Sequence, residues 1–302
     1  MDTPFLPLVL AATLVDAQDP GDRLQLSGAP KEIADSATTR STKRAEVTLI
    51  ENAVDESAGG LACYQITTPT ADWFLEKSGA GLSSLIDRDG NDWINFHPRP
   101  GSGAEGEYRG FPNAVHRQAG NYFHPRNQAT DPATTTVAHR SPKRVTITAQ
   151  SNNGKWACSY DFYATHCTFT MTKLPDAMKY WVLYEGTPGG QYDDSDWWMA
   201  STQDQPLPLT QQHSGDIDGP EWIAFGDRRL NRVLAMLHHE DDGHPDNFYQ
   251  MQHKMTVFGF GRAGLKKFLD NVPQRFSIGL IESSNHAAIG SQLDNVWRGD
   301  SR

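Results

Sequence analysis

From Ala45 onward the chain consists of short apolar runs separated by turn residues. Many of these runs carry β-branched or aromatic residues at every second position, as residues 144–149 (RVTITA) do. This alternation is typical of strands that bury one face. Helical periodicity is weak and is best over residues 264–271. The pattern predicts an all-β fold, a large antiparallel β-sandwich with few short helices.

The expected strands share this alternation and are bounded by Gly, Asn, Asp or Pro. They cover residues 46–51, 62–67, 72–76, 82–87, 136–138, 144–149, 156–163, 167–173, 180–184, 222–226, 233–238, 256–261 and 276–282. Residues 87–91 (DRDGN) and 151–154 (SNNG) have the composition of hairpin turns. The sequence shows no internal repeat of fixed period, which disfavours a propeller.

The N-terminus has the pattern of a secretory signal. Residues 5–15 form an apolar run. Val15 and Ala17 lie at positions −3 and −1 of a possible signal-peptidase cleavage site, where small residues are required. We expect residues 1–17 to be a signal peptide, residues 18–45 a mobile segment and residues 46–302 a single β-sandwich domain. The protein would then be secreted or periplasmic. Because no Lys or Arg precedes the apolar run, a disordered start of the chain is the alternative.

Charge and cysteine content exclude several classes. With 27 Lys and Arg against 37 Asp and Glu, the net charge of −10 argues against general nucleic-acid binding. Beyond the first twenty residues no apolar run is long enough to span a membrane. The three cysteines form no C-x-x-C pair that would indicate structural zinc. A disulfide between Cys158 and Cys167, across an expected hairpin, is left open.

Basic residues concentrate in one segment of this acidic chain. Between Tyr108 and Arg144 the one acidic residue is Asp131, while the basic residues are Arg109, Arg117, Arg126, Arg140, Lys143 and Arg144. Such an island focuses positive potential and favours an anionic ligand. The alternative is a solvated loop with no ligand.

The start of this island, residues 107–126, has the composition of a shaped loop that could carry catalytic groups. β-Elimination on a uronic acid needs a cation or donor on the carboxylate, a base for the C5 proton and an acid for the leaving oxygen. The residues of the loop can fill these roles. We assign Arg109 and Asn113 to the carboxylate, His116 or His124 as base, Tyr122 or Tyr108 as acid, and Arg126 to substrate binding.

Two further segments add candidate binding residues. In residues 238–249, His239 and Tyr249 would form a second wall of the cleft. We also considered a metal site formed by His238, Glu240, Asp242 and His244. Their spacing matches no specific metal-binding pattern, so no metal ligand is assigned.

Residues 184–198 suit sugar binding. Trp197 and Trp198 could stack on the apolar faces of sugar rings, with Glu185 beside them. The acids Asp193, Asp194 and Asp196 leave calcium open as an alternative, although they lack the glycine and closing Glu of an EF-hand loop. We expect no required cofactor.

Residues 79–93 (GAGLSSLIDRDGNDW) resemble a strand pair of the galactose-mutarotase-like β-sandwich superfamily. That superfamily includes sugar epimerases and sandwich domains of polysaccharide lyases and glycosidases. The resemblance implies the fold and a connection with carbohydrate. It assigns no role to any residue, because no catalytic motif aligns position by position.

These observations favour a secreted carbohydrate-active enzyme, a polysaccharide lyase that cleaves a uronic-acid-containing glycan by β-elimination. The expected partner is an acidic polysaccharide or oligosaccharide, with no nucleic acid and no membrane span. A glycoside hydrolase or sugar epimerase on the same scaffold, using Glu185, Glu221 or Glu240, is the first alternative. A non-catalytic carbohydrate-binding module is the second.

Overall fold

The structure, a computed structural model, describes residues 46–300, in which nearly all strands join three antiparallel sheets. The predicted signal peptide (1–17) and mobile segment (18–45) lie outside the described residues. The first sheet has four strands in sequence order: β1 (Thr48–Asp55), β2 (Leu61–Thr67), β3 (Ala71–Glu76) and β4 (Gly81–Asp87).

The largest sheet has nine strands, arranged β11-β10-β13-β14-β19-β8-β7-β6-β5. In that order they are Leu207–Pro208, Asp196–Ala200, Trp222–Asp227, Val233–His238, Gln274–Ile281, His166–Lys173, Ala157–Phe162, Arg144–Ser151 and Ala133–Ser141. The third sheet has the order β12-β15-β16-β9, with β12 (His213–Gly215), β15 (Asp246–Met251), β16 (Met255–Phe260) and β9 (Val182–Gly186). A two-stranded ribbon joins β17 (Arg262–Ala263) to β18 (Lys266–Lys267).

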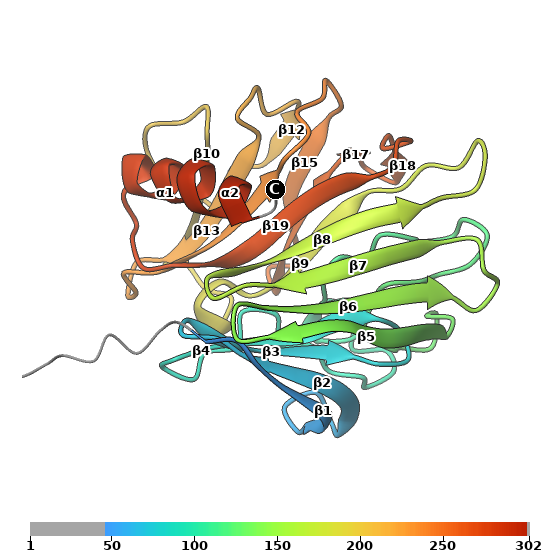
Figure 1. Cartoon of the computed structure of the whole chain (residues 1–302). Helices are drawn as coiled ribbons and strands as arrows, with labels where there is room; N and C mark the ends of the chain where they lie inside the picture. The colour runs from blue at the N-terminus through green and yellow to red at the C-terminus, as the bar shows by residue number, and fades with distance from the viewer. Residues whose placement is uncertain (1–45, 301–302) are drawn as a thin grey trace, which may run out of the picture. The chain divides into compact units, whose positions relative to one another are not determined.

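The two four-stranded sheets pack against one face of the nine-stranded sheet (Figure 1). Trp73 of β3 meets Phe162 of β7 edge-on, with 5.8 Å between ring centroids. In the other half, Tyr184 of β9 lies 5.5 Å from Phe225 of β13. Each fully buried aromatic side chain contributes about 1.5–3 kcal/mol of transfer free energy. Rows of such residues on alternate strand positions therefore join the layers.

Short helices complete the structure. At the C-terminal end, α1 (His286–Gln292), the π-helical turn η3 (Leu293–Trp297) and α2 (Arg298–Asp300) cover the outer face of β10, β13, β14 and β19 (Figure 1). Two 3₁₀ turns, η1 (Gly103–Glu105) and η2 (Pro188–Gly190), lie in loops. In residues 46–300 no helix is long and apolar enough to cross a membrane.

The predicted all-β antiparallel sandwich is confirmed by this strand order. Every expected strand coincides with an observed one within a few residues, whereas β10 and β15 were not predicted. The expected helix at 264–271 is wrong, because β18 occupies that segment. The cysteines also differ from the prediction. Cys158 pairs in register with Met171, and Cys167 with Phe162, so the two thiols are not opposite each other and both are free.

An ion cluster centred on the largely buried Arg232 and the buried Asp87 joins the edges of the two layers. The guanidinium of Arg232 contacts Asp87 at 2.8 Å, Asp89 at 3.0 Å and Glu282 at 2.6 Å. Asp87 ends β4, whereas Arg232 precedes β14 and Glu282 follows β19. The contacts therefore span from the first sheet to the nine-stranded sheet.

We expect Arg232→Met to lower the free energy of unfolding by about 3–5 kcal/mol, because it leaves the fully buried Asp87 carboxylate without its cation. Urea unfolding of the wild type and variant measures this. Arg99→Met is the matched control, since Arg99 is mostly exposed in its pair with Glu105 and is expected to change stability by about 0–1 kcal/mol. Equal effects of the two substitutions would contradict the cluster's role.

Candidate functional site

A cavity of about 410 Å³ opens between the third sheet and the loop that precedes β5. Its size lies in the range of small-molecule sites, about 300–1000 Å³. The lining combines polar, charged and aromatic side chains. The polar, charged and aromatic residues that line it include Tyr108, Asn113, His116, Arg117, His124, Trp181, Glu185, Tyr249 and Arg262.

One face of the third sheet forms the floor of this cavity. Glu185 of β9 pairs with Val257 of β16, which pairs with Tyr249 of β15, so the three side chains stand in one row across the sheet. Leu183 and Met251, two positions away on their strands, also line the cavity. Tyr184 and its neighbours on the opposite face enter the core. Strand alternation thus places Glu185 toward the cavity.

The loop is attached to this floor by backbone hydrogen bonds. Gly110 and Glu185 exchange both backbone bonds, at 2.7 and 3.0 Å, and Leu183 N–H donates to the Pro112 carbonyl at 2.7 Å. Asn113, held at φ +41°, then donates its side-chain amide to Glu185 Oε2 at 2.7 Å. Trp181 Nε1 donates to the Asn113 carbonyl at 2.7 Å. The loop residue and the strand carboxylate are therefore positioned as one unit.

Glu185 is the titratable group best suited to proton transfer here. It is 6% exposed, and burial raises its pKa to about 7, against a smaller opposing effect of the Asn113 hydrogen bond. A carboxyl group with a pKa near the working pH can both accept and return a proton.

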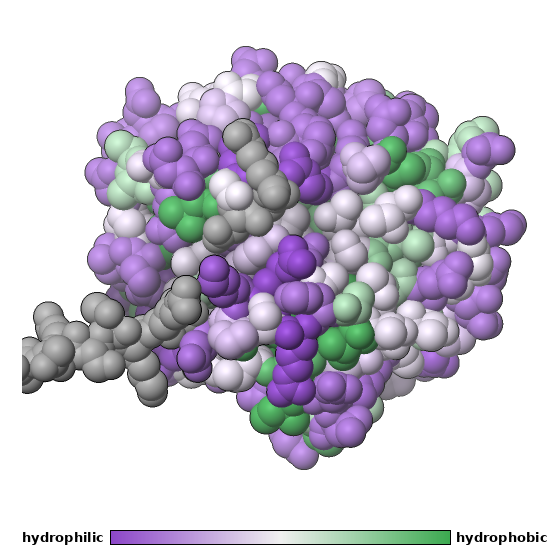
Figure 2. Space-filling view, in the orientation of Figure 1, coloured by the Kyte–Doolittle hydropathy of each residue, from purple (hydrophilic) through white to green (hydrophobic). Residues whose placement is uncertain are grey.

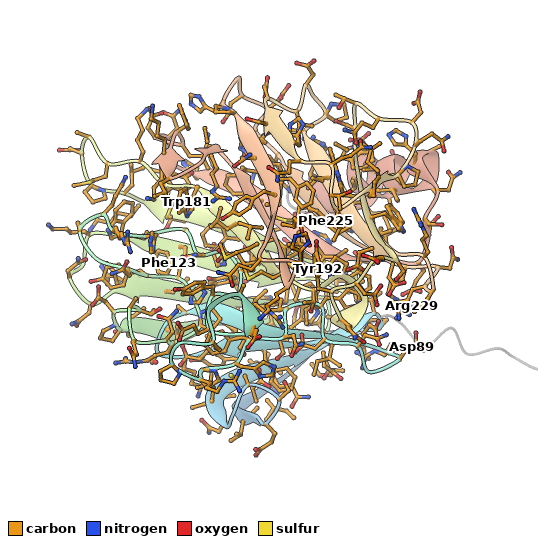
Figure 3. All side chains as sticks on the ribbon, turned by 180° about the vertical axis from the view of Figure 1, so that it is seen from behind. Asp89, Phe123, Trp181, Tyr192, Phe225 and Arg229 are labelled. Carbon is orange, nitrogen blue, oxygen red and sulfur yellow. The ribbon has the colours of Figure 1, made fainter. Side chains whose placement is uncertain are left out.

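His116 lies on the wall of the cavity. Its ring stacks on Trp181 with 6.2 Å between centroids and 15° between planes. Burial, together with the nearby charges of Lys267 and Arg117, lowers its pKa to about 4, so the imidazole is neutral at pH 7. Figure 3 shows Trp181 near the edge of the molecule, toward the left of that view.

Arg262 brings a buried positive charge to the cavity. It is 4% exposed and its guanidinium lies over two rings, 4.8 Å from Tyr249 and 5.3 Å from Trp181. Nε donates to the Gly264 carbonyl at 2.9 Å and Nη2 to the Tyr249 hydroxyl at 3.2 Å. Nη1 is buried and has no hydrogen-bond partner among the described residues. A buried donor without a partner costs about 1–3 kcal/mol, which an anionic ligand would recover.

Three residues of the predicted catalytic set are not available for the roles assigned to them. Arg109 is buried and donates to the carbonyls of Ala104, Asn95 and Lys254, so it binds the chain rather than a carboxylate.

Tyr122 is 4% exposed, belongs to the hydrophobic core and is not among the residues that line the cavity. His124 lines the cavity, but its ring nitrogens lie 2.6 Å from the Pro125 carbonyl and 3.3 Å from the Tyr108 carbonyl. These contacts leave His124 without a free nitrogen for proton transfer.

Four predicted binding residues lie away from the cavity. Trp198 is buried in the central core and Trp197 beneath the C-terminal helices, because alternate residues of β10 face opposite sides of the sheet. His239 is buried and its Nε2 lies 2.8 Å from Ser277 Oγ. Arg126 is exposed and outside the cavity lining. Of the predicted binding set, Glu185 and Tyr249 line the cavity.

The carboxylate pairs proposed for hydrolysis are not brought together in this cavity. Neither Glu221 nor Glu240 belongs to its lining. Glu221 is buried beside His238, and Glu240 forms an ion pair with Arg275 at 2.6 Å. Of the acids considered for calcium, Asp193 is engaged, since Arg229 contacts it at 2.8 Å and Ser195 Oγ donates to it at 2.6 Å.

Sequence reasoning missed Arg262, Trp181 and Arg117 as parts of the site. Trp181 stood inside the expected strand at 180–184, and Arg262 directly followed the expected strand at 256–261. A charged residue at the end of an apolar strand was the available signal.

No family model matches the chain, and no curated protein matches it by sequence. Among solved structures, the chain is similar to a galactose mutarotase-like protein from Lactobacillus casei (12% identity, TM-score 0.44, 72% of this chain and 98% of that one). It is also similar to a galactose mutarotase related enzyme from Lactobacillus acidophilus (9%, 0.45, 74% and 99%). A third is an alpha-galactosidase from Lactobacillus brevis (10%, 0.46, 78% and 41%).

These similarities are at low sequence identity and assign no role to any residue of this chain. The role of each residue rests on the geometry of this chain alone.

Proposed function

We propose that the cavity is the active site of a polysaccharide lyase that cleaves a uronic-acid-containing glycan by β-elimination. One observation carries this proposal: the carboxyl group of Glu185, with a pKa of about 7, lines the same cavity as the unpartnered Nη1 of Arg262. The first group can move a proton, and the second can bind the carboxylate that makes the C5 proton acidic.

Each step has a residue in the cavity. Arg262 Nη1 donates to the uronate carboxylate and stabilises the charge that develops on it. The Glu185 carboxylate takes the proton from C5, the C5–H electrons form the C4–C5 double bond, and the C4–O bond breaks. The leaving oxygen receives a proton from the Tyr249 hydroxyl, which accepts a hydrogen bond from Arg262 and keeps its own proton free to donate. The proton on Glu185 then returns to Tyr249 through solvent.

The rest of the lining suits an acidic glycan. Tyr108 is 46% exposed at the rim and offers an aromatic face to a sugar ring, the role that the sequence had assigned to Trp197 and Trp198. Arg117, exposed at the same rim, adds positive charge in a chain of net charge −10. With an acidic polysaccharide as substrate we also propose a secreted or periplasmic location, which the apolar run at 5–15 supports.

A sugar epimerase is the second candidate, favoured by the presence of both His116 and Glu185 in the lining of one cavity. Glu185 would take the proton of an anomeric hydroxyl and an imidazole would protonate the ring oxygen. Because its pKa is about 4, His116 is neutral at pH 7 and lacks the proton that it would have to donate, so this candidate ranks below elimination.

The test incubates the purified protein with polyuronates and records absorbance near the ultraviolet band of unsaturated uronic acids. Elimination produces the absorbing double bond. An epimerase would change optical rotation without absorbance, and a hydrolase would release reducing ends without absorbance. A binding module would retain glycans and form no product. Any of these three outcomes would contradict the lyase proposal.

The pH dependence follows from Glu185. As a base the carboxyl group must be ionised, and its pKa of about 7 means that the ionised fraction rises between pH 6 and pH 8. We therefore expect kcat/KM to increase with pH across this range and to level off above it, with a midpoint near 7. Initial rates at constant ionic strength measure the profile. A rate that falls over the same interval would show that the protonated form is the active one.

A further inference from the structure

We propose that Asp216, Glu221 and Asp246 bind a divalent cation that prefers oxygen ligands, Ca²⁺, at a site separate from the cavity. The three residues lie where β12 ends and β13 and β15 begin. Each offers an oxygen, and these atoms all lie within 4.8 Å of one another. This inference does not depend on the lyase proposal.

The first argument is a buried oxygen without a partner. Glu221 is 1% exposed, and its carboxyl group lies within hydrogen-bond reach of the Asp246 carboxyl group. Glu221 Oε1 meets no N–H or hydroxyl donor among the described residues, while Oε2 lies 2.6 Å from His238 Nδ1. Asp242 Oδ2, close enough to act on Glu221 electrostatically, is also buried without a partner. Burying a carboxylate oxygen in this way is costly unless a proton or a cation meets it.

The second argument is the absence of a compensating basic residue. Two further acids, Asp218 and Asp241, lie close enough to Asp216 to make it harder to ionise. Among residues 46–300, no Lys or Arg forms an ion pair with Asp216, Asp218, Glu221, Asp241, Asp242 or Asp246, whereas the buried Asp87 and Asp227 each pair with an arginine. Of the basic side chains in the described residues, the His238 imidazole lies 2.6 Å from Glu221, and His244 acts electrostatically on Asp216.

The third argument is that the inner two carboxylates are held in place. Asp246 Oδ1 accepts from Gly261 N–H at 3.1 Å and Oδ2 from Ile217 N–H at 3.2 Å. Glu221 is oriented by His238, whose ring stacks on Phe276 at 4.4 Å. Outer hydrogen bonds of this kind orient metal ligands in protein sites.

The character of the ligand set favours Ca²⁺ over Mg²⁺. Ca²⁺ takes oxygen ligands at about 2.3–2.6 Å in a flexible geometry, and three carboxylate oxygens within 4.8 Å of one another are compatible with it. Mg²⁺ demands a near-ideal octahedral geometry at about 2.0–2.1 Å, which a set with one exposed carboxylate imposes less readily. The exposed Asp216 leaves the site open on one side, where water can complete the coordination.

A cation here would also stabilise one side of the proposed active site. Asp246 binds Gly261 N–H, and the next residue, Arg262, donates its backbone N–H to the Pro245 carbonyl at 2.6 Å. Fixing Asp246 therefore fixes the turn from which the Arg262 side chain enters the cavity.

The test titrates chelator-treated full-length protein with CaCl₂ by isothermal titration calorimetry and repeats thermal unfolding with and without the ion. We expect one ion per chain and, at a hundredfold excess over Kd, a Tm increase of about 5 °C or more. Asp216→Asn, which alters an exposed residue and should fold normally, is expected to weaken binding by about tenfold or more. Glu221→Gln should abolish it.

Asp294→Asn, an exposed acid on the C-terminal helical segment, is the matched control and should bind like the wild type. Absence of both heat and Tm change in the wild type would overturn the proposal and leave a proton shared by Glu221 and Asp246 as the compensating charge. Equal binding by wild type and Asp216→Asn would place the ion elsewhere. Binding of MgCl₂ or MnCl₂ but not CaCl₂ would overturn the assignment to calcium.

Discussion

Glu185→Gln is expected to lower kcat on a polyuronate by about 10²–10⁴-fold, the usual contribution of a positioned general base. The substitution removes the proton acceptor but keeps the shape of the side chain. Its amide oxygen can still accept the hydrogen bond from Asn113, so the loop should remain attached to β9. Steady-state rates from ultraviolet absorbance measure the loss.

The stability of the same variant separates catalysis from folding. Burial raises the pKa of Glu185 above its value in the unfolded chain. The folded wild type therefore loses stability as the pH rises above 7 and the group ionises, whereas a Gln at this position stays neutral and causes no such loss. We expect the Tm of Glu185→Gln at pH 8 to equal or exceed that of the wild type. Glu107→Gln, also in the cavity lining, is the control and should keep its rate. A Glu185→Gln enzyme with the wild-type rate would end the proposed role of this residue.

Arg262→Met is expected to lower kcat/KM for a uronate substrate by about 10–150-fold, since hydrogen bonds to charged groups contribute about 1.5–3 kcal/mol. Met keeps an unbranched side chain between Tyr249 and Trp181 and removes the guanidinium. The loss should depend on the substrate's charge. On a methyl-esterified polymer, which carries no carboxylate, the variant and the wild type should differ little.

Arg117→Met supplies the comparison for this prediction. Arg117 is exposed at the cavity rim, and such charges change association rates and salt dependence more than they change bound-state energies. We expect a loss of less than about tenfold that disappears at high salt, whereas the Arg262→Met loss persists there. If Arg262→Met affects the ester and the free acid equally, the carboxylate does not bind Arg262.

The strand pattern could be predicted because it is local. Residues 144–149 alternate apolar and polar side chains, and β6 covers them. β15 was missed for the opposite reason: its sequence, DNFYQM, mixes a core-facing Phe248 with residues that line a cavity, so no apolar run marks it. The C-terminal helices were missed because their apolar residues are few and pack on the outer face of a sheet.

The site was predicted in part. The loop at 107–126 was identified by its composition, and Asn113, His116, Tyr108 and His124 do line the cavity. From the sequence, Arg109 could not be distinguished from an arginine that binds a ligand. Its guanidinium donates hydrogen bonds to backbone carbonyls of distant segments, including that of Lys254, and only the folded chain shows these contacts. Only the packed chain decides which basic side chain keeps a free nitrogen.

The sequence by itself determined the strand order along the chain, the sandwich class and the segment that lines the cavity, since period-two alternation and turn residues act over a few positions. The tertiary structure alone decided which charged groups face that cavity and which are neutralised by the chain. The exposure, hydrogen-bond partners and pKa values of Glu185 and Arg262 depend on β9, β15, β16 and the loop arriving together from positions far apart. The free energy of ionising each group depends on the dielectric around it and on its charged and hydrogen-bonding partners. A local sequence pattern contains neither. At the surface, Figure 2 shows apolar residues scattered in small groups among hydrophilic ones on the face in view.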